Sequence, residues 1–108
     1  MVQYLRDTGI VFRALGDDTR RDILLRLKDG PRTVTALSSS YRMSLPALLK
    51  HLRVLETAGL VRTGKTGRVR SCALAPDGLR SAALWLSEYE DFWTDRLDAL
   101  DTHLKENP

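Results

Sequence analysis

The sequence predicts a mostly α-helical chain with one small β-hairpin, and three observations support this prediction. Residues 44–61 carry an apolar helical repeat that ends at Gly59 and continues directly into a strand. Residues 62–70 are basic and contain two glycines, a pattern typical of a hairpin. Residues 76–105 place apolar side chains at steps of three or four, which predicts one amphipathic helix of roughly 30 residues and about 45 Å.

The composition is that of a single globular domain. The chain has 108 residues, of which 43% are hydrophobic and 29% are charged, and this length supports one modest core. No uncharged apolar run approaches the roughly 18 residues of a membrane span, and residues 1–10 lack the apolar block of a signal peptide. We therefore expect one domain over residues 1–108, no membrane partner and a cytoplasmic location. Cys72 is the single cysteine, and we expect it to be a small buried residue in a strand.

Charge is distributed unevenly along the chain. Residues 1–75 contain 14 Lys or Arg and 6 Asp or Glu, a net charge of +8, whereas residues 76–108 contain 3 and 8, a net charge of −5. A basic body predicts a polyanionic partner, and the acidic tail predicts a different role for the last helix.

Residues 2–15 and 18–29 are expected to form the first two helices. The second begins at a capping aspartate, either Asp17 or Asp18. Its arginines, Arg20 and Arg21, lie outside the apolar stripe, and we expect them to be solvated helix charges. The stripe itself consists of Ile23, Leu24 and Leu27.

A short third helix and a longer fourth helix predict a helix-turn-helix over about residues 33–59. Thr33 caps the third helix and Ser44 caps the fourth. Pro46 falls in the first turn of the fourth helix, where its missing N–H does no harm. The inward stripe of this helix is expected to comprise Leu45, Leu48, Leu52 and Leu55.

The outward face of the fourth helix has the residue types that reading a DNA major groove requires. Such a helix needs small residues at its leading end and one or two long donors behind them. Pro46 and Ala47 are small, and Lys50 and His51 follow them. This pattern indicates a helix that contacts base edges and phosphates.

The hairpin behind this helix is expected over about residues 60–74, with strands at 60–62 and 69–74 and a loop at 64–67. It carries four cations within nine residues and no acid, a cluster that repels itself unless an anion such as the phosphate backbone compensates it. The sequence therefore predicts a winged helix-turn-helix that binds duplex DNA. The expected contacts are Thr33, Ser44, Pro46, Ala47, Lys50, His51, Arg62, Lys65, Arg68 and Arg70.

The last helix, expected over about residues 76–105, is too long to bury wholly against a domain of this size. Its surplus apolar surface most simply packs against a second copy of the chain. We therefore predict a dimerisation helix and a homodimer, with an interface formed by Leu5, Phe12, Leu86, Tyr89, Trp93, Leu97, Leu100 and Leu104. The sequence offers no nucleophile–base pair, glycine-rich phosphate loop or spaced carboxylate pair, so we expect no enzyme, no catalytic residues and no cofactor.

Two segments resemble the arsenic-responsive repressor (ArsR) family of bacterial winged-helix regulators. They are Phe12 to Leu24 and Ser44 to Val61, and the Gly67-Arg68 wing follows the same pattern. The resemblance implies a homodimer built from the first and last helices. It also implies an operator in double-stranded DNA, repression of transcription, and release by an inducer that the sequence does not identify.

The chain departs from the family's patterns at three places. The third helix has no cysteine pair, and the last helix lacks the histidine that would complete an Asp-x-His and His-x-x-Glu set. Leu49 replaces the serine that usually precedes the Lys-His pair. The first two departures predict no metal site, and the Trp-rich last helix resembles the metal-independent branch of the family. The change at Leu49 removes one polar DNA contact that the family pattern implies. A metal-responsive sensor of the same family and a winged-helix protein-interaction module remain the alternatives.

Overall fold

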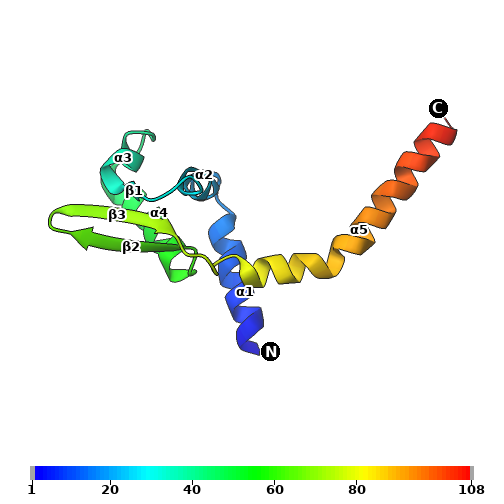
Figure 1. Cartoon of the computed structure of the whole chain (residues 1–108), viewed down its shortest axis with the longest axis horizontal. Coiled ribbons are helices and arrows are strands. Elements are labelled where there is room, and N and C mark those ends of the chain that lie inside the picture. The colour runs from blue at the N-terminus through cyan, green and yellow to red at the C-terminus, as the bar shows by residue number, and fades with distance from the viewer. Residues whose placement is uncertain (1, 108) are drawn as a thin grey trace.

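The structure is a computed structural model that describes residues 2–107, with side chains from residue 6 onwards. Along this part of the chain the elements are α1 (Val2–Leu15), α2 (Asp18–Leu27), β1 (Arg32–Thr33), α3 (Val34–Ser38), α4 (Leu45–Thr57), β2 (Val61–Thr66), β3 (Val69–Leu74) and α5 (Arg80–Glu106). The helices α1–α4 and the sheet form a body, and α5 extends away from it (Figure 1). The predicted mostly helical winged helix-turn-helix with a long C-terminal helix is confirmed.

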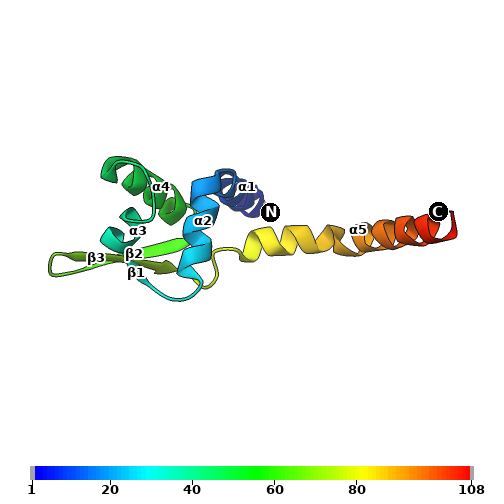
Figure 2. The ribbon, with the colours of Figure 1, turned by 90° about the horizontal axis from the view of Figure 1, so that it is seen from above.

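The core lies between the helices and an antiparallel sheet with strand order β1-β3-β2. Helices α3 and α4 lie on one side of this sheet (Figure 2). The side chains that fill the core are almost completely buried and come mainly from α2, α4 and the two hairpin strands: Ile23, Leu27, Leu37, Leu48, Leu52, Leu55, Leu60, Val61 and Cys72. Burial of Cys72 agrees with the sequence-based prediction.

Three side-chain caps fix where the helices of the body begin. Asp17 Oδ2 accepts a hydrogen bond from the Arg20 backbone N–H over 3.0 Å, which starts α2. Thr33 Oγ1 accepts from the Ala36 N–H over 3.0 Å, and Ser44 Oγ accepts from the Ala47 N–H over 3.3 Å. Each cap satisfies a backbone donor that has no partner inside its helix.

The hairpin is longer than the sequence-based prediction. Gly64 and Lys65, expected in the loop, lie within β2 and pair with Ser71 and Arg70. The turn is reduced to Gly67 and Arg68, and Gly67 has φ +63°. A two-residue turn with a positive φ at its first position matches the twist of the strands, so β2 continues to Thr66, four residues beyond its expected end at residue 62.

Two other features of the body differ from the sequence-based prediction. β1 was not foreseen, because two residues after a proline are too few to show strand alternation; Arg32 pairs with Cys72, and Thr33 pairs with Ser71. Leu45 is 49% exposed, because the first turn of α4 lies beyond the core and the buried stripe begins at Leu48.

The last helix begins at Arg80 rather than at residue 76. The preceding residues form a turn in which the Gly78 N–H donates to the Ala75 carbonyl over 3.1 Å. α5 then runs for 27 residues. Its C-terminal end and the hairpin tip lie at the two ends of the molecule (Figure 2). None of the helices in residues 2–107 is both long and apolar enough to cross a membrane.

Candidate nucleic-acid interface

The outward face of α4 presents two unpaired cations. Lys50 and Arg53 are exposed, together with Pro46 at the start of the helix, while Ala47 is half-buried. Neither cation forms an ion pair with any described residue. Arg53 was missed in the sequence analysis, although its spacing of three residues from Lys50 places both on one helix face.

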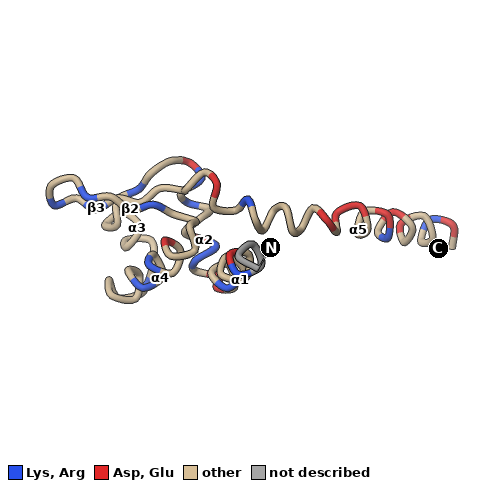
Figure 3. The backbone as a smooth tube through the Cα atoms, turned by 90° about the horizontal axis from the view of Figure 1, so that it is seen from below, with Lys and Arg blue, Asp and Glu red and all other residues tan. Residues whose placement is uncertain are grey.

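The tip of the wing presents three more unpaired cations. Lys65 and Arg70 are directly opposite each other in the ladder, Arg68 lies in the turn, and all three are exposed. Like charges at opposite strand positions destabilise a hairpin, and no described carboxylate forms an ion pair with them. Basic residues mark both the tip of the hairpin and α4, whereas acidic residues dominate the distal part of α5 (Figure 3).

The wing and α4 are joined on the side where these cations lie. Thr63, on the same strand face as Lys65, donates a hydrogen bond from Oγ1 to Glu56 Oε1 of α4 over 3.0 Å. Next to this hydrogen bond, a hollow is lined by the start of α4, by α3 and by the wing arginines Arg68 and Arg70. The wing tip and the leading end of α4 therefore border one continuous surface.

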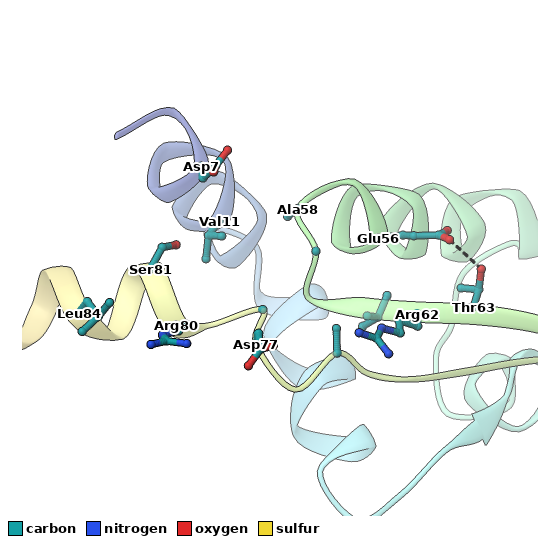
Figure 4. Close-up of a pocket in the computed structure, with 14 residues that line it drawn as sticks. Asp7, Val11, Glu56, Ala58, Arg62, Thr63, Asp77, Arg80, Ser81 and Leu84 are labelled. Atoms are coloured by element: carbon teal, nitrogen blue, oxygen red, sulfur yellow. Dashed lines mark hydrogen bonds between the residues drawn. The ribbon is translucent and has the colours of Figure 1, made fainter. Parts of the chain in front are cut away.

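Arg62 lies apart from the other predicted wing cations. It pairs with Ala73, and strand alternation directs it to the opposite face from Lys65. Arg62 lines a hollow between α1, the end of α4, β2 and the start of α5, together with Asp77 and Arg80 (Figure 4). The structure thus brings Lys65, Arg68 and Arg70 together but not Arg62.

His51 is directed toward α2. Its side chain is 23% exposed, and Nδ1 lies 3.7 Å from Asp17 Oδ2 and 3.4 Å from an Arg20 guanidinium nitrogen. Thr33 and Ser44, also predicted as DNA contacts, use their hydroxyl oxygens to cap α3 and α4. Of the predicted residues on α4, Lys50 is the long donor that the helix presents to solvent.

Arg20 is not the solvated charge that the sequence predicted. Its Nε donates to the Ala14 carbonyl over 2.6 Å, and Nη2 donates to the Arg13 carbonyl over 3.1 Å. These carbonyls belong to the last turn of α1, where a cation is favourable to the helix dipole. Arg21 is exposed, pairs with Asp18 and donates to the Leu15 carbonyl over 2.5 Å.

The turn between α3 and α4 is attached to α2 by a cluster of three side chains. The Tyr41 hydroxyl donates to Asp22 Oδ2 over 2.5 Å, Arg26 Nε donates to the same oxygen over 2.8 Å, and the Arg26 guanidinium lies 5.3 Å from the centre of the Tyr41 ring. The hydrogen bonds from Tyr41 and Arg26 lower the pKa of Asp22, and burial raises the pKa of Tyr41 to about 12. This cluster fixes the approach of the turn and hence the direction of α4.

The chain's soft and imidazole ligands do not converge on one point. Cys72 is buried in β3, where its Sγ contacts the Arg32 carbonyl at 3.5 Å and burial raises the pKa of the thiol. His51 packs against α2, while His103, near the end of α5, contacts Asn107. Zinc and related metals need several such ligands around one centre, and the arrangement of these three residues does not fit a shared metal site.

The predicted interface residues on α5 are exposed in the single chain. Leu97 is 62% exposed and Trp93 is 60% exposed, whereas Phe12 on α1 is half-buried and packs edge-to-face on Trp85 with ring centres 5.5 Å apart. The remaining exposed members on α5 are Leu86, Tyr89, Leu100 and Leu104. The side chain of Leu5 lies outside the described residues.

The fold and its basic surface define a winged helix-turn-helix DNA-binding protein, and comparisons with known proteins agree. Residues 15–64 match the model of a helix-turn-helix domain family. The chain is 43% identical over 92 residues to the HTH-type transcriptional regulator Rv2034 of Mycobacterium tuberculosis, covering 85% of this chain and 83% of that protein.

Two solved structures extend this similarity to the whole fold. The crystal structure of the ArsR family transcriptional regulator RHA00566 superposes with a TM-score of 0.78 and 41% identity, covering 87% of this chain and 97% of the other. The homodimeric winged helix-turn-helix DNA-binding domain Mb0332 of Mycobacterium bovis, a possible ArsR-family regulator, has a TM-score of 0.67 and 25% identity, covering 84% and 86%. The chain belongs to the ArsR family of DNA-binding transcriptional regulators.

Proposed function

We propose that the chain is a homodimeric, metal-independent repressor that reads its operator with α4 and the wing. One observation carries the proposal: five exposed cations without ion pairs among the described residues lie on two neighbouring elements, Lys50 and Arg53 on α4 and Lys65, Arg68 and Arg70 on the wing. Phosphates of a duplex supply the negative charge that this surface lacks.

In this proposal each side chain has a separate role. Lys50 reaches a base edge or an adjacent phosphate from within the major groove, with Pro46 and Ala47 small enough for close approach. The wing cations contact phosphates along the duplex, and an arginine can enter the minor groove. Thr33 and Ser44 contribute indirectly, because their caps fix where α3 and α4 begin and so orient the leading end of α4.

The exposed face of α5 supports a dimer. Its apolar side chains, with Trp93 and Leu97 among them, need a partner surface, and the homodimeric Mycobacterium bovis relative supports a second copy of the same chain. A two-fold axis would place two α4 helices about 34 Å apart on one face of the duplex. A dimer bound in this way represses any promoter that its operator overlaps, because it excludes the polymerase.

Release from DNA by a small-molecule inducer is part of the proposal. The hollow that contains Arg62, Asp77 and Arg80 supports it, because β2 and α4 of the reading surface meet α1 and α5 there (Figure 4). A ligand held at such a junction can favour one arrangement of the reading surface relative to α1 and α5 over another arrangement. The mismatch of the cysteine and histidine positions with a metal site favours an organic inducer over a metal ion.

Quantitative binding to labelled duplexes tests the proposal. We expect Lys50→Ala to weaken specific binding by about tenfold and to reduce discrimination between sequences, which corresponds to loss of one good base contact. Arg68→Ala should weaken binding to all duplexes alike. It should also reduce the magnitude of the slope of log K, the logarithm of the binding constant, against log salt by about 0.9. Lys105→Ala, which removes the same charge from the far end of α5, is the control and should leave both quantities unchanged.

The alternatives predict different results. A protein-interaction module would bind no duplex at moderate salt. Lys50→Ala and Arg68→Ala would then show the same absence of DNA binding as the parent protein. A metal-responsive sensor would lose DNA affinity on addition of zinc, nickel or arsenite, whereas we expect no change with any of the three.

A further inference from the structure

The Arg20 side chain links three helices of the body, because it belongs to α2 and its guanidinium contacts α1 and α4. Its Nε and Nη2 donate to the Ala14 and Arg13 carbonyls of α1 over 2.6 and 3.1 Å. Its Nη1 lies 3.4 Å from His51 Nδ1 on α4. The residue itself lies in the first turn of α2, where its backbone N–H donates to the Asp17 cap.

The direction of the contact with His51 depends on the tautomer of the imidazole. A guanidinium only donates hydrogen bonds, so Nδ1 accepts from Arg20 in the tautomer that carries its proton on Nε2. The side chain of His51 is 23% exposed, and Asp17 Oδ2 is 3.7 Å from the same nitrogen. The imidazole therefore lies between the carboxylate of Asp17, the N-cap of α2, and the guanidinium of Arg20. In α4, His51 directly follows the exposed Lys50.

Further contacts connect α1 to α5, the helix with the exposed apolar face. α1 carries Phe12 two residues before Ala14, and the Phe12 ring packs against Trp85 of α5 at 5.5 Å between ring centres. A series of direct contacts thus runs from α5 through α1 and Arg20 to His51 on α4. Arg21 caps the same end of α1 at the Leu15 carbonyl, but its other contact is with Asp18 on α2.

We propose that Arg20 is a positioning residue that sets α4 relative to the dimerisation helices by holding His51. The inference rests on the proposed DNA-binding function and deepens it. The distance between the two reading helices of a dimer must match one helical turn of the duplex, so a small displacement of α4 against α1 changes the fit to an operator. It has little effect on phosphate contacts that do not depend on sequence.

The test compares Arg20→Gln with Arg21→Gln, which removes the same charge from the same end of α1. Specific binding is measured on a duplex that the parent protein selects from a random-sequence pool, and non-specific binding is measured on a scrambled duplex at the same salt. We expect Arg20→Gln to weaken specific binding by about tenfold more than Arg21→Gln, the loss typical of one misplaced base contact. Both variants should bind the scrambled duplex equally.

A double-mutant cycle with His51→Ala separates positioning from stability. If Arg20 acts through His51, the Arg20→Gln effect on specific affinity disappears in the His51→Ala background. Arg20→Lys keeps the charge but has a single ammonium that cannot reach both α1 and α4, so its specific affinity should resemble that of Arg20→Gln. If Arg20→Gln does not fold, Arg20→Lys takes its place in the cycle, at a temperature where all the variants are folded.

Two results would overturn the inference while leaving the proposed function intact. One is equal loss of specific affinity in the Arg20 and Arg21 variants, and the other is additivity of the Arg20 and His51 effects. A parent protein that selects no duplex from the pool would instead overturn the proposed function, and this inference with it.

Discussion

Replacing Gly78 with alanine is expected to destabilise the junction between the winged body and α5. A Cβ at this position would lie 2.3 Å from the Gly59 carbonyl oxygen and 2.8 Å from Leu60 Cα. Both are backbone atoms, and ordinary contacts of a Cβ begin near 3.4 Å. The turn would have to move by about 1 Å, against a neighbour that is anchored because Leu60 is buried and its carbonyl accepts from the Ala75 N–H over 3.0 Å.

The cost follows from these contacts. Overpacking costs about 1–3 kcal/mol, and strain on the Ala75–Leu60 hydrogen bond adds about 1 kcal/mol. The free energy of unfolding should therefore fall by about 2–4 kcal/mol, which lowers the melting temperature of a chain of this length by roughly 10 °C or more.

The assay is thermal and urea unfolding at one fixed protein concentration, because association shifts the apparent stability. Gly64→Ala is the matched control: its Cβ would meet no heavy atom within 4 Å, and its φ is not positive. We expect this control to change stability by less than about 1 kcal/mol. Equal stability of Gly78→Ala and Gly64→Ala would refute the close approach of the turn to the end of α4.

Three more outcomes are expected. Leu97→Asp should raise the dimer dissociation constant by at least about tenfold in sedimentation because it places a charge on the apolar face, whereas Thr102→Asp on the opposite face should not. Tyr41→Phe removes the hydrogen bond to Asp22 and should cost about 1 kcal/mol in urea unfolding. Hydrogen bonds lower the pKa of Asp22 and of Asp17 below 3.8, so both carboxylates stabilise the fold above that pH, and stability should be lost as the pH falls through their folded pKa values. In acid titrations of the free energy of unfolding, Asp22→Asn should lose less stability than the parent protein as the pH falls.

Local signals in the sequence predicted most of the fold correctly. The caps Thr33 and Ser44 start α3 and α4 where the sequence placed them, because an N-cap depends on residues only three positions away. The long apolar repeat of α5 also identified a helix without tertiary information. Leu45 was assigned wrongly because periodicity gives the face of a residue but not how far the core extends along the helix.

The parts that the sequence did not reveal depend on contacts between distant residues. The position of Arg62 relative to Lys65 depends on the length of β2, because alternation places the two side chains on opposite faces only if one strand contains both. The two-residue turn at Gly67 sets that length. The contact between Arg20 and His51 joins residues 31 positions apart. No local pattern predicts such a pair, so Arg20 could be identified as more than a solvated charge only from the structure.

Selection of duplex DNA from a random-sequence pool, followed by measurement of the stoichiometry of the bound complex, tests the central claim most directly. The account predicts enrichment of an inverted repeat with half-site centres about 10–11 base pairs apart, bound by two copies of the chain. Lys50→Ala should lose the enrichment, while Lys105→Ala keeps it. Absence of any enriched sequence, or a single chain bound to an asymmetric site, would contradict the account of a dimer that reads DNA with α4 and the wing.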